Sequence, residues 1–223
     1  MDGVKPGDIK RLLVLEDLPK PVSYYSLPGL ISMDGTHTLR RVLGTVPVEA
    51  DGSASFEAPA LRALYFVALD ERGVAVKRMQ SYTMVMPGET QGCVGCHEAR
   101  TNTVKPALSG ALTALKRPPS QIESVPGVPE VFDYPRDIQP IWDRHCVACH
   151  SAEKPEGRVI LTGDHNEWFS QSYYALFSSK QVSDIWGYDD IAVYPPYTLG
   201  SPASPLMNKL DGSHYEAKLS ERE

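Results

Sequence analysis

Cysteine is scarce in this sequence of 223 residues, since its four cysteines are too few to hold together a disulfide-built fold of this length. Long hydrophobic runs are missing as well: no stretch of eighteen apolar residues occurs, so no membrane-spanning helix is predicted. Basic residues number 22 against 28 acidic ones, giving a formal charge of −6, and there is no basic block. A general nucleic-acid-binding protein is therefore not expected. The remaining composition, 42% hydrophobic and 22% charged, is that of a globular protein.

An export signal is also absent from the start of the sequence. Residues 1–6 contain no apolar core segment of the kind that a secretory signal requires. We therefore expect either that a signal has been removed or that the sequence is a piece of a longer polypeptide.

All four cysteines belong to two copies of one short motif, Cys-x-x-Cys-His. The copies are Cys93-Val94-Gly95-Cys96-His97 and Cys146-Val147-Ala148-Cys149-His150. Two thiols three positions apart can each form a thioether bond with a vinyl group of a porphyrin, and the adjacent imidazole then lies under the ring as a ligand to iron. The motifs predict two covalently attached c-type haems, with His97 and His150 as the proximal iron ligands.

Two other uses of paired cysteines fit this spacing less well. A zinc ribbon usually separates its cysteine pairs by about 15–20 residues, whereas 49 residues lie between Cys96 and Cys146. A redox dithiol of the thioredoxin kind lies between a strand and a helix, and neither motif is predicted to do so. Because haem is attached to such motifs outside the cytoplasm, the haem interpretation also predicts a periplasmic or otherwise exported protein.

The N-terminal part has the pattern of β structure. Short apolar runs at 11–15 and 64–69 are bounded by turn residues, and turns are expected at 51–53 and 70–73. Strands at this spacing predict a small β-sandwich that leads into the first haem motif.

Helical patterns follow a stretch rich in proline. Five prolines within 117–135 predict a stiff, extended linker. Beyond it, residues 138–145 form a predicted short helix that leads into the second motif. A second helix is predicted through 168–177, with Asp164 or Asn166 as its cap.

These patterns together predict a mixed α+β protein. Its predicted parts are a β-rich domain with the first haem motif over 1–116, the linker over 117–135, and a mostly helical, cytochrome c-like module over 136–223. Ser220 and Glu223 have the spacing of a helix capping box. We therefore expect the last module to be truncated at its C-terminus.

Several segments resemble the hydrazine synthase alpha-subunit middle-domain family, which is abundant in planctomycete multidomain proteins. The resemblance lies in Gly44-Thr45-Val46-Pro47-Val48-Glu49-Ala50-Asp51-Gly52-Ser53 and in Met86-Pro87-Gly88-Glu89 with the first haem motif. Segments 132–141, 161–164 and 212–220 are similar to the domain that follows it in the family. The resemblance implies a redox role within a larger protein.

One position departs from the family. In hydrazine synthase a tyrosine four residues after the first motif's histidine binds iron, while that histidine binds zinc. The corresponding residue here is Thr101, whose hydroxyl is a poor iron ligand, and no fifth cysteine is available for zinc. The simpler interpretation is that His97 binds iron, as in ordinary c-type haems.

The residue on the opposite side of the iron from each proximal histidine, the sixth ligand, distinguishes an electron-transfer haem from a catalytic one. Two strong axial ligands suit electron exchange, whereas an open sixth position lets a small molecule bind. For the second haem the family resemblance points to His214, with Met207 and His165 as alternatives. His145 directly precedes Cys146 and is expected at the surface or beside a haem propionate.

No sixth ligand stands out for the first haem. His37 lies in an apparent turn, where an exposed histidine is the alternative interpretation. Met79, Met84 and Met86 lie close to the motif, but core packing is the role we expect for them. An open site is the other alternative.

Three functions fit these expectations. The first is a dihaem cytochrome that transfers electrons as part of a larger exported oxidoreductase, its acidic surface suited to a basic redox partner or to other domains of a longer chain. The second is a small-molecule redox enzyme, hydrazine-synthase-like or otherwise, with an open first haem. The third is a haem-stabilised binding scaffold.

Overall fold

A computed structural model describes residues 3–19, 39–79, 81–94, 112–166, 169–184, 194–220 and 222–223. The chain divides into two compact units. Unit 1 comprises Met1–Pro19, Leu39–Glu130 and Tyr188–Thr198, and unit 2 comprises Lys20–Thr38, Val131–Gly187 and Leu199–Glu223. Residues 117–130, expected to be a linker, are thus counted with unit 1, and a short segment after the second haem motif also belongs there.

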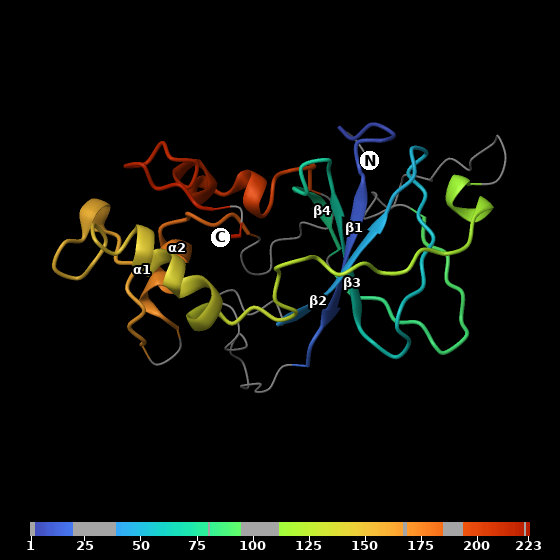
Figure 1. The fold of residues 1–223 in the computed structure, drawn as a ribbon, viewed down its shortest axis with the longest axis horizontal. Coiled ribbons are helices and arrows are strands. Elements are labelled where there is room, and N and C mark those ends of the chain that lie inside the picture. The colour runs from blue at the N-terminus through green and yellow to red at the C-terminus, as the bar shows by residue number, and fades with distance from the viewer. Residues whose placement is uncertain are drawn as a thin grey trace. The chain divides into compact units, whose positions relative to one another are not determined.

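Unit 1 is built on a four-stranded antiparallel sheet with the order β2-β1-β3-β4 (Figure 1). Its strands are β1 (Arg11–Asp17), β2 (Arg40–Pro47), β3 (Leu64–Leu69) and β4 (Ala75–Arg78). The apolar runs predicted as strands are confirmed as β1 and β3. The predicted sandwich is wrong in one respect, because the described part of the chain forms one sheet and not two.

Both faces of the sheet are buried. Leu15 and its cross-strand partner Tyr65 lie on one face, and the guanidinium of Arg40 covers the Tyr65 ring at 3.7 Å from its centre. On the other face the ring of Phe66 meets that of Phe56 edge-on, with centres 5.7 Å apart. Successive side chains of β1 and β3 point to opposite faces, and both faces pack against other side chains. This explains why the sequences of these strands are apolar without interruption.

The predicted turn at 70–73 is confirmed as the β3–β4 hairpin. Asp70 closes it, because its carboxylate accepts hydrogen bonds from the N–H groups of Arg72 and Val74, both at 2.9 Å. Gly73 adopts φ +75°, which an L side chain rarely does. Local turn chemistry is enough to specify this connection.

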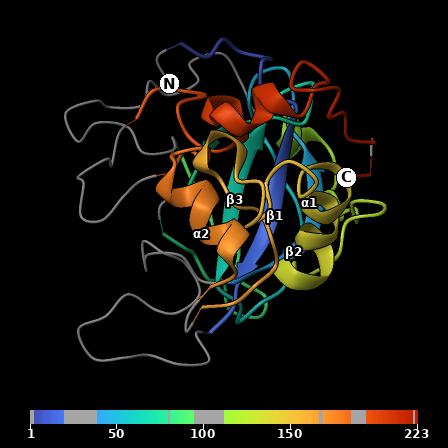
Figure 2. The ribbon, with the colours of Figure 1, turned by 90° about the vertical axis from the view of Figure 1, so that its left-hand side faces the viewer.

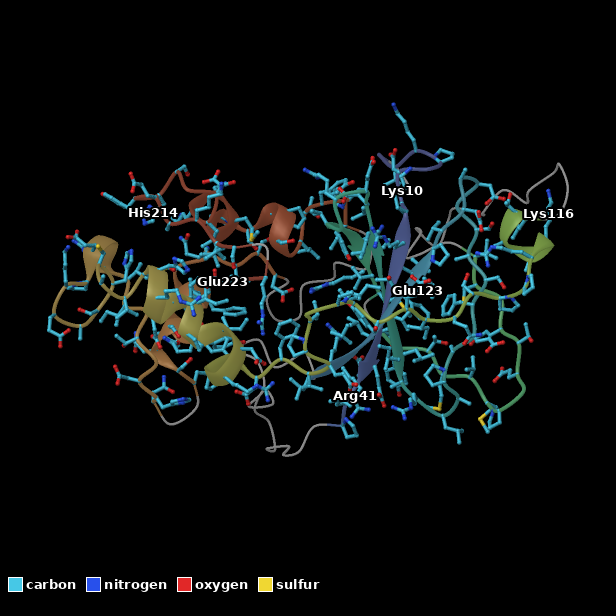
Figure 3. All side chains as sticks on the ribbon, in the orientation of Figure 1. Lys10, Arg41, Lys116, Glu123, His214 and Glu223 are labelled. Atoms are coloured by element: carbon cyan, nitrogen blue, oxygen red, sulfur yellow. The ribbon has the colours of Figure 1, made fainter. Side chains whose placement is uncertain are left out.

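Gly44 in β2 allows a distant segment to cross close to the sheet. The N–H groups of Thr45 and Glu123 each donate to the other's carbonyl, at 2.8 and 3.0 Å. Gly44 has φ +140°, and a Cβ built on it would overlap the Glu123 backbone. Figure 3 labels Glu123 on this crossing segment. The proline-rich stretch is thus held by backbone hydrogen bonds in unit 1.

The edge strand β4 is capped from a remote part of the sequence. The hydroxyl of Tyr194 accepts from the Arg78 N–H and donates to the Arg78 carbonyl, both at 2.9 Å. The N–H of Tyr197 donates to the Val76 carbonyl at 3.0 Å. These bonds satisfy backbone groups that an open sheet edge would leave unpaired. A short 3₁₀ helix, η1 (Thr113–Lys116), completes unit 1.

Unit 2 consists of short helices joined by turns, and Figure 2 shows its helices α1 and α2. Its elements are the π-helical turn η2 (Tyr134–Ile138), the α-helices α1 (Gln139–His145) and α2 (Gln171–Ser178), and the 3₁₀ helices η3 (Glu156–Arg158), η4 (Ser201–Ala203) and η5 (Pro205–Lys209). Trp142 of α1 and Leu176 of α2 belong to one buried cluster with Leu161 and Ala175.

The helix predictions hold in part. The predicted helix at 138–145 is confirmed as α1, with Pro140 in its first turn. The second helix begins later than predicted, at Gln171, and its N-cap is Ser170. Asn166 caps a preceding turn instead, since its side-chain oxygen accepts from the Phe169 N–H at 2.7 Å.

Candidate cofactor site

Helix α1 delivers the second Cys-x-x-Cys-His motif. The N–H groups of Cys146 and Val147 both donate to the carbonyl of Trp142, at 2.8 and 3.0 Å, so the motif continues the last turn of the helix. The N–H of His150 donates to the Cys146 carbonyl at 3.0 Å and closes the next turn. The buried Trp142 ring thus anchors the helix end that presents the motif.

A buried chain of hydrogen bonds fixes α1 within unit 2. The indole N–H of Trp142 donates to the Tyr134 hydroxyl at 2.9 Å, and that hydroxyl donates to Ser172 Oγ at 3.1 Å. Ser172 in turn donates to the Gln139 side-chain oxygen at 2.5 Å, and the Gln139 amide donates to the Leu161 carbonyl at 3.0 Å. Burial raises the pKa of Tyr134, so its hydroxyl stays protonated and acts as a donor.

The imidazole of His150 is oriented by a backbone carbonyl. Its Nδ1 lies 3.1 Å from the carbonyl oxygen of Val159. Since a carbonyl only accepts, Nδ1 carries the proton and Nε2 keeps its lone pair. This is the arrangement by which proteins orient a metal-binding histidine.

His214 lies opposite His150. The two ring centres are 6.1 Å apart and the ring planes differ by 21°. His214 is labelled in Figure 3 on the C-terminal segment. A hairpin-like turn presents it: Asp211 bridges to Lys218, and the Ala217 N–H donates to the His214 carbonyl at 2.9 Å.

The separation of these rings fits one metal ion between two imidazoles. Imidazoles that bind a metal from opposite sides each place a nitrogen about 2 Å from it, so their ring centres lie about 6 Å apart. Cys146 and Cys149 precede His150 in the motif, and neither is in a disulfide. Burial raises the pKa of the Cys146 thiol, and Lys154 Nζ lies 3.7 Å from Cys149 Sγ. Among the described residues, no three or more His, Cys, Asp or Glu side chains are grouped so that they could hold a metal ion directly. In a c-type haem the two thiols attach the porphyrin and only the imidazoles bind iron, and this is the use that the motif and the histidine pair permit.

The other residues predicted as candidate ligands to a second haem lie elsewhere in unit 2. His165 is exposed and bridges to Ser170, and Met207 is 46% exposed in η5. His145 Nε2 lies 3.2 Å from a carboxylate oxygen of Glu223. Glu223 lies beside α1 (Figure 3). Among the described histidines, it is His214 that the structure brings to His150.

Most of the first motif lies outside the described residues. Cys93 is described and exposed, whereas Cys96, His97, His37 and Thr101 are not among the described residues.

The methionines before the first motif divide into two kinds. Met79 packs against the sheet core, as expected, and its sulfur accepts from the Phe66 N–H at 3.3 Å. Met84 and Met86 are 46% and 56% exposed, so the expectation that they pack in the core is wrong.

Two residues near the site were not found from the sequence. The carbonyl of Val159 acts through its backbone, so no residue type at 159 could have indicated it. Tyr215, which meets the His214 ring edge-on at 4.9 Å, has φ +49° and is 89% exposed. A tyrosine beside a candidate ligand was the one available hint.

Residues 7–98 match the family model of the hydrazine synthase alpha subunit middle domain. Among solved structures, a chain of hydrazine synthase from Kuenenia stuttgartiensis has a similar fold, with a TM-score of 0.57 and 20% sequence identity. The match covers 78% of this chain and 30% of that one. No curated protein matches the sequence.

No helix within the described ranges combines the length and the apolar character that a bilayer span requires.

Proposed function

We propose that this chain is a dihaem c-type cytochrome module that transfers electrons within a larger, exported redox enzyme. The observation that carries the proposal is the pair of His150 and His214, whose ring centres lie 6.1 Å apart, with Cys146 and Cys149 free in the motif that ends at His150.

Each residue of the second site has a distinct role in this proposal. Cys146 and Cys149 would attach the porphyrin through thioether bonds, and His150 and His214 would bind iron from opposite sides. The Val159 carbonyl holds the His150 ring in the tautomer that leaves Nε2 available. A haem bound here supplies a one-electron iron couple. Because both axial positions would be filled, electron exchange would need little rearrangement.

The first site is proposed from its motif. Cys93 and Cys96 would attach a second porphyrin, with His97 as proximal ligand. The exposure of Cys93 supports this, since the attachment of haem needs an accessible thiol.

The role within a larger enzyme is supported by the comparisons. The match covers 30% of the hydrazine synthase chain, and residues 7–98 match a domain family of that enzyme's alpha subunit. Electrons would pass to other domains of a longer protein or to a separate redox partner. Attachment of c-type haem outside the cytoplasm supports a periplasmic or otherwise exported location.

Ligand-state spectroscopy of the ferric holoprotein tests this function. Electron paramagnetic resonance and near-infrared magnetic circular dichroism should show a low-spin haem with two histidine ligands. High-spin signals from both haems, with immediate binding of cyanide or nitric oxide at both, would contradict electron transfer.

A second candidate is an enzyme that converts a small nitrogen compound or peroxide at an open first haem. The match of residues 7–98 to the middle domain of hydrazine synthase supports it, because the matched region ends at the first haem motif. Single replacements of His37, Met79, Met84 and Met86 should then leave the first haem's spectrum unchanged. A change of spin state in any one variant would argue against an open site.

A further inference from the structure

The two candidate axial ligands of the second site are held differently. His150 Nδ1 lies 3.1 Å from the Val159 carbonyl oxygen, whereas neither ring nitrogen of His214 has a hydrogen-bond partner in the part of the chain that the structure describes. The His214 ring contacts two other rings, those of His150 and Tyr215. A histidine that binds a metal nearly always donates its second N–H to an acceptor, and loss of that acceptor typically weakens binding by about 10- to 100-fold. His214 is therefore the weaker ligand of the pair.

The turn that follows His214 is strained. Tyr215 and Glu216 adopt φ +49° and +63°, so two successive residues with side chains occupy the left-handed region. This region is disfavoured for residues that carry a Cβ, and strain of this kind concentrates at functional sites. Because the strain belongs to the conformation that brings His214 to His150, it favours conformations in which the turn relaxes and His214 moves away.

The two histidines also differ in what supports them. Tyr215 is 89% exposed, so the turn that carries His214 can move without uncovering the core of unit 2. Val159, whose carbonyl orients His150, packs against the buried cluster around Trp142. Release of His150 would therefore disturb that core, whereas release of His214 would not.

We propose that His214 is a displaceable ligand, so that the reduced second haem binds a small neutral diatomic molecule in its place while His150 stays bound. This inference rests on the proposed function, because it requires a haem on the second motif. The exchange breaks the bond between His214 and iron and forms one bond to the incoming molecule, and no electron or proton is gained or lost. The electron-transfer module thereby also contains a ligand-binding site that opens on one side.

The kinetics of carbon monoxide binding test this proposal. The holoprotein is reduced with dithionite and mixed with carbon monoxide, and the Soret absorbance is followed by stopped flow. Since His214 must leave first, the observed rate should rise with carbon monoxide concentration and then level off. In His214→Ala it should rise linearly, and the affinity should be at least about tenfold higher, because the open form is no longer a minor population. The kinetic phase that differs between the two proteins belongs to the second haem.

Two results would overturn the proposal. One is a reduced second haem that binds no carbon monoxide, and the other is a rate that levels off at the same value in wild type and His214→Ala. Electron paramagnetic resonance of the ferric wild type is measured first. Absence of a low-spin haem with two histidine ligands would refute the proposed function itself, whereas a low-spin second haem that excludes carbon monoxide after reduction would refute only this inference.

A matched pair of substitutions tests the contribution of the strained turn. Asparagine adopts the left-handed region more readily than glutamate or lysine and lacks the extra backbone freedom of glycine. Glu216→Asn should hold His214 more firmly and lower the carbon monoxide affinity of the second haem about two- to fivefold. Lys180→Asn relieves φ +55° elsewhere in unit 2 and should leave the affinity unchanged. An affinity that is unaltered in Glu216→Asn, or lowered equally in both variants, contradicts a turn that weakens the hold on His214.

Discussion

His150 and His214 lie opposite each other with ring centres 6.1 Å apart, although 64 positions separate them in the sequence. One is held by the helical turn that follows α1 and by the Val159 carbonyl, and the other by the turn between Asp211 and Lys218. Independent segments of unit 2 thus converge to leave the space that one metal ion between two imidazoles requires.

Replacing His214 should open one face of the second haem. In His214→Ala we expect complete loss of the low-spin signal of that haem and the appearance of a high-spin one, because no second strong ligand remains. Electron paramagnetic resonance of the ferric protein measures both signals.

His165→Ala is the matched control for this experiment. His165 is exposed and bridges to Ser170, so its replacement should leave both haem spectra unchanged. A low-spin second haem that survives in His214→Ala but not in His165→Ala would assign the ligand to His165 instead.

Ser172 joins the hydrogen bonds that fix α1. Ser172→Ala removes the donor to Gln139 and the acceptor for Tyr134, and leaves buried polar atoms unpaired. We expect a loss of about 1–3 kcal/mol in the free energy of unfolding, measured by urea titration of the holoprotein through the second haem's absorbance. Ser178→Ala, at an exposed position of α2, should change it by less than about 0.5 kcal/mol; equal losses would show that the network is not stabilising.

Gly44 cannot be replaced without moving the segment that crosses it. Gly44→Ala combines φ +140° with overlap between the new Cβ and the Glu123 backbone. We expect a loss on the order of 2–4 kcal/mol, seen as faster hydrogen exchange at the amides of β1 and β2. Gly92→Ala meets no atom within 4 Å and should exchange like the wild type. If the amides of β1 and β2 in Gly44→Ala exchanged as slowly as in the wild type, the segment at Glu123 would be able to move away from the new Cβ at little cost in stability.

Asp51 makes the stability of unit 1 depend on pH. The Ser53 hydroxyl and then the Thr113 N–H donate to its carboxylate and hold the pKa of Asp51 well below its usual range. A lowered pKa stabilises the folded state above the ordinary value, and this contribution disappears as pH falls through the folded pKa. The difference in stability between wild type and Asp51→Asn should therefore be constant above about pH 5 and shrink below about pH 4. Urea titrations at pH 3, 4, 5 and 7 measure it, and a difference that grows in acid would contradict the account.

Local sequence patterns were sufficient to predict the strands and the turn that depend on interactions between neighbouring residues. The runs at 11–15 and 64–69 predicted β1 and β3, and the turn chemistry of Asp70 and Gly73 predicted the hairpin. These elements form because alternating burial and turn preferences act over a few residues.

Long-range packing was not accessible in the same way. The proline-rich stretch was expected to be a stiff, extended linker, because nothing near Glu123 indicates that it pairs with Thr45 across Gly44. Met84 and Met86 were expected in the core but are exposed. Their burial depends on whether another segment packs over them, and the local sequence does not show this. The facing of His214 and His150 was suggested by family resemblance, and no spacing rule could have supplied it.

The proposed electron-transfer function depends most directly on two covalently bound haems, and the mass of the intact protein tests whether both are present. Expressed with a cytochrome c maturation system in an exporting host, the 24.6 kDa polypeptide should gain roughly 1.2 kDa. Protease digestion should then place one haem on the peptide with Cys93 and Cys96 and one on the peptide with Cys146 and Cys149. A mass equal to that of the bare polypeptide, under conditions in which a control cytochrome is fully loaded, would contradict the account.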